Sequence, residues 1–84
     1  MTKLLPSLPI IEVVTDANGE PAQLRWRHWR SAVAAVCNRW RVEDDWWRHE
    51  VARDYYKIRT VDGTLCVVFR DRKQGTWHLQ RVYD

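Results

Sequence analysis

The sequence predicts a small, mainly β domain, built as a curled antiparallel sheet or a small SH3-like barrel of five to six strands. Short runs of β-branched and aromatic residues alternate with polar ones and are separated by turn residues. Asp62-Gly63 joins two of these runs, and this dipeptide is a strong signal for a β-hairpin. The chain has 84 residues without an internal repeat or a linker, which indicates one domain.

The N-terminal residues carry little pattern. Residues 1–9 contain Pro6 and Pro9, so we expect a flexible tail ahead of a single β-rich domain over residues 10–84. The same stretch is too short and too interrupted for a signal peptide, and no apolar run has the length of a membrane span. These features predict a cytoplasmic protein that does not enter a membrane.

Two strands are expected in the first third of the domain. The β-branched run Ile10–Val14 predicts a strand, and the segment Thr15–Pro21, which contains Asn18-Gly19, predicts a loop. Ala22–Arg30 is then read as a second strand. Its alternation would divide the indoles and cations between two sides, with Trp26, His28 and Arg30 on one and Arg25, Arg27 and Trp29 on the other.

Residues 31–41 fit two structures. Val33, Val36, Cys37 and Trp40 have the spacing of a helix face, and the alanines between them also favour a helix. A strand with one bulge would instead place Val33 inward and, after a slip of one residue, Val36 and Trp40 inward. The segment is short and has no glycine at its end, which counts against a helix. The preference for a bent strand comes mainly from the family resemblance given below, and one short helix is the alternative.

The segment from Asp54 to Arg70 predicts a hairpin closed by Asp62 and Gly63 in a type I′ turn. In this register Ile58 faces Val67 and Tyr56 faces Phe69, and these pairs form an apolar face. The other face would then carry an aromatic and basic outer row: Tyr55, Lys57, Arg59, Cys66, Val68 and Arg70.

The last strand is expected over Thr76–Tyr83. Trp77 and Leu79 would point inward and His78 and Gln80 outward, because successive side chains of a strand alternate.

The charge of the chain is only mildly basic, but its distribution is uneven. The formal net charge is +3, and eleven of the fourteen basic residues are arginine. Five arginines and no acid occur between Ala22 and Arg41. Arginine suits bidentate contacts to phosphate and stacking on bases, although exposed arginines also pair with acids or keep a protein soluble.

Interleaved cations and aromatic rings suit single-stranded nucleic acid, because rings stack on bases and cations contact phosphates. The same residues have a structural interpretation, in which the tryptophans are core, arginine stems cover them, and Tyr55 packs on Arg70 across the hairpin. The candidate residues for binding nucleic acid or a partner are Arg25, Arg27, Arg30, Tyr55, Lys57, Arg59, Arg70 and His78.

Catalysis and metal binding are not expected. The histidines and the cysteines Cys37 and Cys66 show no zinc-site spacing, and the two cysteines are expected to be free thiols. No nucleophile motif, P-loop or dinucleotide-binding motif is present. We therefore predict a protein that is not an enzyme and has no cofactor and no metal.

Residues 22 to 84 resemble a family of small bacterial domains of unknown function. These domains occur beside, or fused C-terminal to, Y-family DNA polymerase homologues of the ImuB type. The most specific matches are Trp46-Trp47 followed by Arg53-Asp54-Tyr55-Tyr56, and the closing Arg81-Val82-Tyr83-Asp84. The other matching residues are Trp26, Trp29-Arg30, Val33, Val36, Trp40-Arg41, Asp45, Lys57, Gly63, Phe69-Arg70-Asp71 and Trp77-His78-Leu79-Gln80.

ImuB-type proteins look like polymerases without catalytic carboxylates and serve as hubs in the error-prone repair of damaged DNA. The resemblance therefore implies a place in DNA repair or translesion synthesis. This chain has no polymerase part, so it would be a free-standing module. Together with the surface chemistry, the resemblance predicts a nucleic-acid-binding accessory domain for DNA, single-stranded DNA favoured. The alternative is a protein–protein interaction adaptor that docks a DNA-repair protein through the same Trp, Tyr and Arg surface, without binding nucleic acid.

Overall fold

All the regular structure in the computed structural model is β-strand, within the residues that it describes, which are 2–4, 9–46 and 49–83. None of these residues belongs to a helix that could cross a membrane. The strands are β1 (Thr2–Leu4), β2 (Ile10–Thr15), β3 (Pro21–Trp26), β4 (Trp29–Trp46), β5 (His49–Thr60), β6 (Leu65–Asp71) and β7 (Thr76–Tyr83).

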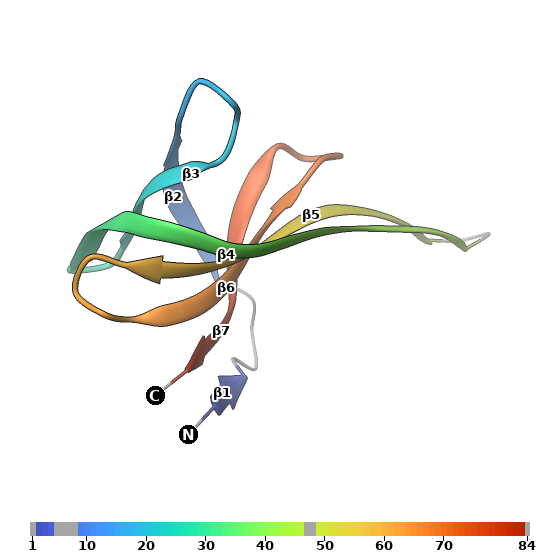
Figure 1. Ribbon diagram of the computed structural model, residues 1–84. Coiled ribbons are helices and arrows are strands. Elements are labelled where there is room, and N and C mark those ends of the chain that lie inside the picture. The colour runs from blue at the N-terminus through green and yellow to red at the C-terminus, as the bar shows by residue number, and fades with distance from the viewer. Residues whose placement is uncertain (1, 5–8, 47–48, 84) are drawn as a thin grey trace.

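The sheet closes on itself. Every pairing is antiparallel, and the order runs β7-β2-β3-β4-β5-β6 before β6 pairs with β7 again. Six strands therefore form a small antiparallel barrel, which confirms the predicted fold class (Figure 1). Residues 2–4, expected within the tail, form β1 along one end of β7.

The closure between β2 and β7 is short. It consists of the register pairs Ile10 with His78 and Ile11 with Trp77, to which the Leu79 N–H adds a bond to the Pro9 carbonyl (3.1 Å). We call this closure the β2–β7 seam.

Residues 31–41 form a strand with two bulges. The pairing of β4 with β5 shifts once between Val33 and Ala35 and again between Val36 and Asn38. Val33 and Val36 pack against the barrel core as predicted. The prediction of a single bulge was wrong, and the second bulge turns Trp40 to the outer face.

The prediction of one strand over Ala22–Arg30 was also wrong. β3 ends at Trp26 and β4 begins at Trp29, so that these two residues face each other across a turn formed by Arg27 and His28. Arg27 has φ +57° in this turn, a conformation that side chains other than glycine seldom adopt. No glycine marks the turn, which is why the sequence pattern hid it.

The Asp62-Gly63 hairpin exists, but its predicted register was wrong by one residue. The Gly63 N–H donates to the Thr60 carbonyl (3.0 Å), and Thr60 N–H donates to the Thr64 carbonyl (2.9 Å). The loop thus has three residues, with Gly63 alone at positive φ (+91°), instead of the two expected. Asp62 favours this loop because its carboxylate accepts bonds from the Thr60 hydroxyl and the Thr64 N–H.

The shifted register exchanges the two faces of β6. Ile58 faces Cys66 and Tyr56 faces Val68, so Cys66 and Val68 point into the barrel instead of outward. The buried residues of this interior cluster are Ile11, Leu24, Ile58, Cys66, Val68, Trp77 and Leu79, which confirms the inward prediction for the last strand. A second cluster on the outer face contains Tyr55, Val67 and Phe69.

The β4–β5 hairpin extends beyond the barrel as an arm (Figure 1). Its pairs run to Trp46 with His49, whereas β6 pairs with β5 only from Arg53 to Arg59. The outer part of the arm therefore has two strands.

Candidate nucleic-acid interface

Four rings lie side by side across the outer face, one from each of strands β4 to β7. The register places Trp40 beside Tyr55, Tyr55 beside Phe69, and Phe69 beside His78. Successive ring centroids are 5.3, 5.0 and 4.9 Å apart. These distances are typical of aromatic contact, so the four rings form a continuous row that we call the aromatic ladder.

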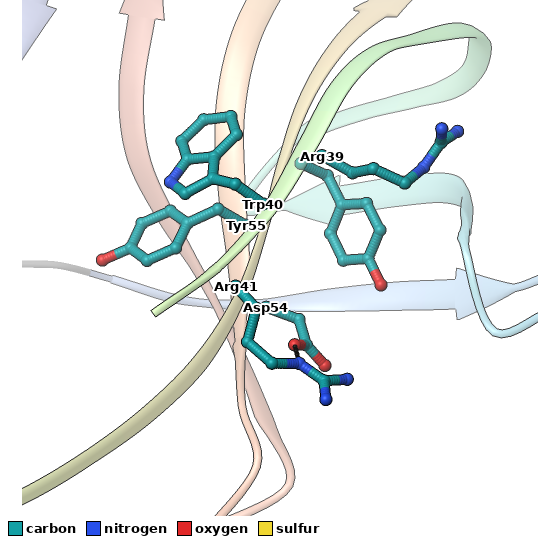
Figure 2. Close-up of a pocket in the computed structure, with 6 residues that line it drawn as sticks. Arg39, Trp40, Arg41, Asp54 and Tyr55 are labelled. Carbon is teal, nitrogen blue, oxygen red and sulfur yellow. Dashed lines mark hydrogen bonds and ion pairs between the residues drawn. The ribbon is translucent and has the colours of Figure 1, made fainter. Parts of the chain in front are cut away.

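From Phe69 toward β4, the exposure of the rings in the aromatic ladder increases. Phe69 is 1% exposed and Tyr55 is 7% exposed, whereas Trp40 is 40% exposed. The Trp40 and Tyr55 planes differ by 5°, and Figure 2 shows the two rings lying parallel on the same side of the hairpin. Trp40 is thus supported from beneath by Tyr55 and still offers ring surface to a ligand.

This arrangement corrects the predicted roles of two residues. Tyr55 was expected to be the exposed ring, but it is buried between Trp40 and Phe69. Trp40 was expected inward, and the second bulge of β4 places it outside. His78 lies on the outer side as predicted, half-buried against Phe69, and its Nε2 is 2.9 Å from the Thr76 hydroxyl.

Cations continue the outer face beside the ladder. Lys57 and Arg59 follow Tyr55 at intervals of two along β5, so they share its face. Arg81 of β7 joins them across the sheet, because it pairs with Val67, and Val67 pairs with Lys57. These three cations form no ion pair with the acids that the structure describes.

The three cations differ in how tightly they are held. The Lys57 ammonium lies 5.0 Å from the centroid of Tyr83, a cation–π contact, whereas Arg59 is exposed. The Arg81 Nε is buried and has no hydrogen-bond partner within the described part of the chain. We call Lys57, Arg59 and Arg81 the outer cations.

Arg53 lies two residues before Tyr55 on β5 and therefore shares its face. Its guanidinium lies 4.4 Å from the Phe69 centroid and donates to the Tyr55 hydroxyl (3.2 Å). Arg53 therefore covers the buried part of the aromatic ladder. Sequence reasoning missed Arg53, although the same two-residue interval that selected Tyr55, Lys57 and Arg59 also reaches it.

Arg70 does not belong to this face, which corrects its predicted place in the outer row. It pairs with Asp54 on one side and Trp77 on the other, on the face of β6 opposite to Phe69. Arg70 is exposed, but the one-residue error in the hairpin register assigned it to the wrong side.

The remaining predicted cations gather at the β3–β4 turn, at the other end of β4 from Trp40. Arg25 and Arg30 are exposed cross-strand neighbours, and Arg25 lies 3.8 Å from Glu12. Arg27 lies over the Trp26 ring at 4.9 Å. Trp26 and its neighbour Trp29 are half-buried against the interior cluster, which supports the structural interpretation of both indoles.

A hollow of about 230 Å³ lies at the root of the arm, where Figure 2 shows Arg39, Arg41 and Asp54 near the Trp40–Tyr55 stack. Arg41 donates to Asp54 (2.8 Å), and this bond raises the pKa of Arg41. Arg39 pairs with Glu20. Acids therefore neutralise the arginines here, in contrast to the outer cations.

The other reactive groups add no further site among the residues that the structure describes. The residues that the structure describes contain no cluster of His, Cys, Asp and Glu suited to a metal ion. Cys37 is exposed and Cys66 is buried, and both are free thiols. Burial, with a smaller contribution from the charge of Asp62, raises the pKa of the Cys66 thiol to about 12. Cys66 is therefore not a nucleophile at neutral pH.

Comparisons with protein-family models, with curated proteins and with solved structures each found no match. The resemblance to domains associated with ImuB-type polymerases therefore stays a prediction.

Proposed function

We propose that this protein is a non-catalytic, nucleic-acid-binding module that holds a single strand on the outer face of β4 to β7. The observation that carries the proposal is the exposed ring of Trp40 at the end of the aromatic ladder, on the same face as the outer cations, which have no acidic partner among the residues that the structure describes. An exposed ring supplies stacking, and unpaired cations supply phosphate contacts.

The geometry suits an extended strand. A base stacked on Trp40 would gain about 1–3 kcal/mol, and this gain does not depend on base identity. Tyr55, Lys57 and Arg59 follow one another on the same face of β5, so the cations extend over about 13 Å from the Tyr55 position at 3.3 Å per residue. That length accommodates a few nucleotides.

A single strand is favoured over a duplex by the position of Trp40. Its ring lies flat on Tyr55 and offers a broad face, which only an unstacked base can cover. Duplex bases are already stacked on one another, so a duplex would be left with phosphate contacts alone.

The cellular setting follows from the resemblance to ImuB-associated domains. We propose a cytoplasmic accessory module for DNA repair or translesion synthesis, with exposed single-stranded DNA as its ligand. If no nucleic acid binds, the same surface would serve a protein partner, because Trp and Arg are also common at protein hot spots.

Fluorescence anisotropy tests the proposal with labelled single- and double-stranded oligonucleotides of one sequence at about 50 and about 200 mM salt. We expect tighter binding of the single strand and a steep loss of affinity with salt. Arg59→Glu should weaken binding to all sequences and lower the salt slope by about one unit. An absence of salt-sensitive affinity for any DNA or RNA would rule the proposal out in favour of the protein adaptor.

Arg70→Glu is the matched control for Arg59→Glu. Both substitutions reverse the charge of one exposed arginine, but Arg70 lies on the opposite face of the sheet. We expect Arg70→Glu to retain most of the affinity, whereas equal losses in the two variants would indicate binding through net charge alone.

A further inference from the structure

Strand β4 has one open edge along most of its length. β3 pairs with β4 only from Trp29 to Ala32, and β5 pairs with the opposite edge from Val33 to Trp46. Beyond Ala32, no strand of the described residues lies against the edge that β3 leaves, and Figure 1 shows β4 entering the projecting arm there. Open edges are templates for further strands, and a two-stranded hairpin is marginally stable alone.

The backbone groups on this edge can be identified. The Ala52 carbonyl accepts from the Arg72 N–H, so the backbone groups of Ala52 face β6 and those of its β4 partner Glu43 face away from β5. The Arg39 N–H, four residues earlier, donates to its neighbour's side-chain oxygen, Asn38 Oδ1 (2.9 Å). In an antiparallel strand, the N–H and C=O of one residue point to the same edge, and alternate residues point the same way. The backbone groups of Arg41 and Glu43 therefore also point to the open edge, and the register with β5 is regular throughout this part.

The charges along the open edge are complementary to themselves. If two copies of β4 pair antiparallel about Val42, Arg41 of each copy lies opposite Glu43 of the other. A shift by two residues would place Glu43 against Glu43, or Arg41 against Arg41, and like charges directly opposite destabilise a sheet. A shift by one residue would not bring the edge-pointing backbone groups together.

We propose that the protein forms a symmetric dimer in which β4 pairs antiparallel with β4 of a second copy, with the two-fold axis at Val42. The paired side chains are accessible, because the Arg41 and Glu43 side chains are 60% and 62% exposed. Each already has a partner in its own chain, Asp54 for Arg41 and Arg72 for Glu43. A guanidinium has five donors and a carboxylate several acceptor positions, so each group can also bind across the interface.

Mixing two charge-reversal variants tests this register. Arg41→Glu alone faces two carboxylates against each other at both symmetric positions, and Glu43→Arg alone faces two guanidiniums. We expect each variant to dimerise about tenfold more weakly than the wild type in sedimentation velocity. In an equimolar mixture, heterodimers have opposite charges at both positions, so association should return toward the wild-type level.

Mixing cannot repair the lost contacts to Asp54 or Arg72, because those contacts lie within one chain. Recovery on mixing is therefore specific to an intermolecular Arg41–Glu43 pair. A wild type that stays monomeric at the highest soluble concentration would overturn the proposal. So would a mixture that associates no better than the separate variants.

A cross-link tests the position of the axis. Opposite residues in a non-hydrogen-bonded antiparallel pair have Cα atoms about 4.5 Å apart, within the range of a disulfide. In a Cys37→Ser background, Val42→Cys should form a covalent dimer under mild oxidation. Glu43→Cys is the matched control, since two Glu43 positions would be separated by about 7–8 Å or more along a diagonal. Equal cross-linking of both variants would contradict the proposed axis.

Discussion

The two apolar clusters of this barrel lie on opposite faces of β5 and β6, and they differ in how completely they are covered. The interior cluster, around Ile58, Cys66 and Val68, is fully buried and is enclosed by strands on all sides. The outer cluster, around Tyr55 and Phe69, has a sheet on one side only and is covered by side chains such as Arg53.

This difference assigns different tasks to the two faces. The buried residues of the interior cluster are almost inaccessible to a ligand, so their packing stabilises the fold instead of contributing to binding. The outer cluster continues through Tyr55 to Trp40, where the ring becomes exposed. Substitutions inside the barrel should therefore change stability, and substitutions at the exposed end should change binding.

The largest effect on stability is expected inside. Ile58→Ala removes a fully buried side chain from the interior cluster and should lower the free energy of unfolding by about 2–5 kcal/mol. Urea denaturation followed by tryptophan fluorescence measures this loss. Under conditions in which Ile58→Ala is folded, it should bind oligonucleotides with the affinity of the wild type. A selective loss of affinity would show that the two faces are not separate.

The hairpin loop decides which residues of β6 enter each cluster, so it should be the next most sensitive position. Gly63 has φ +91° and no atom within 4 Å of an added Cβ, so Gly63→Val tests the backbone conformation without a clash at Cβ. We expect a loss of about 1–3 kcal/mol in thermal or urea unfolding. Gly63→Asn is the control, because Asn tolerates positive φ, and it should cost clearly less.

The exposed end of the ladder should show the opposite behaviour. Trp40→Ala is expected to weaken single-strand binding by about 1–3 kcal/mol, measured by anisotropy, and to change the melting temperature little. Trp40→Phe keeps a ring on Tyr55 and should retain part of the affinity. If Trp40→Ala unfolds the domain while binding persists, the ring belongs to the fold rather than to a ligand site.

The smallest expected effect is a pH dependence of stability that arises from Asp62 in the β5–β6 loop. The Asp62 carboxylate accepts hydrogen bonds from the Thr60 hydroxyl, the Thr64 N–H and the Trp29 indole, and these bonds hold its pKa well below the usual range. Because the pKa is lowered by folding, the stabilisation is present above the unfolded value of about 3.9 and is lost as the pH falls toward the folded value.

Asp62→Asn should therefore melt at a lower temperature than the wild type near neutral pH, and this gap should narrow below about pH 4. Calorimetry over a pH series measures the gap. A gap that stays constant down to the acid-unfolded state would mean that the carboxylate charge does not stabilise the loop.

The sequence was sufficient for the all-β fold, for the last strand and for the existence of the hairpin, because those rest on alternation and turn residues. It was insufficient for register. Asp62-Gly63 fits a two-residue and a three-residue loop, and the observed loop is favoured by the hydrogen bonds that the Asp62 carboxylate accepts from the Thr60 hydroxyl and the Thr64 N–H. The Trp26–Trp29 turn carried no glycine to reveal it.

The same limit applied to the candidate site. Lys57 and Arg59 were found because they alternate with Tyr56 and Ile58 within one strand. Arg70 was misplaced because its face depends on pairing between strands. Trp40 was misplaced because bulges arise from competing pairings that single-strand periodicity does not contain.

The short β2–β7 seam has a consequence for motion. The seam closes the barrel through the pairs Ile10 with His78 and Ile11 with Trp77, which are far fewer than the register pairs between β4 and β5. Regions with few backbone hydrogen bonds open locally more often, so the amide protons at this seam should exchange with solvent faster than those of β5 and β6. His78 belongs both to the seam and to the aromatic ladder. Single-stranded nucleic acid bound on the outer face should therefore slow amide exchange at the β2–β7 seam, which lies at the opposite end of the aromatic ladder from Trp40.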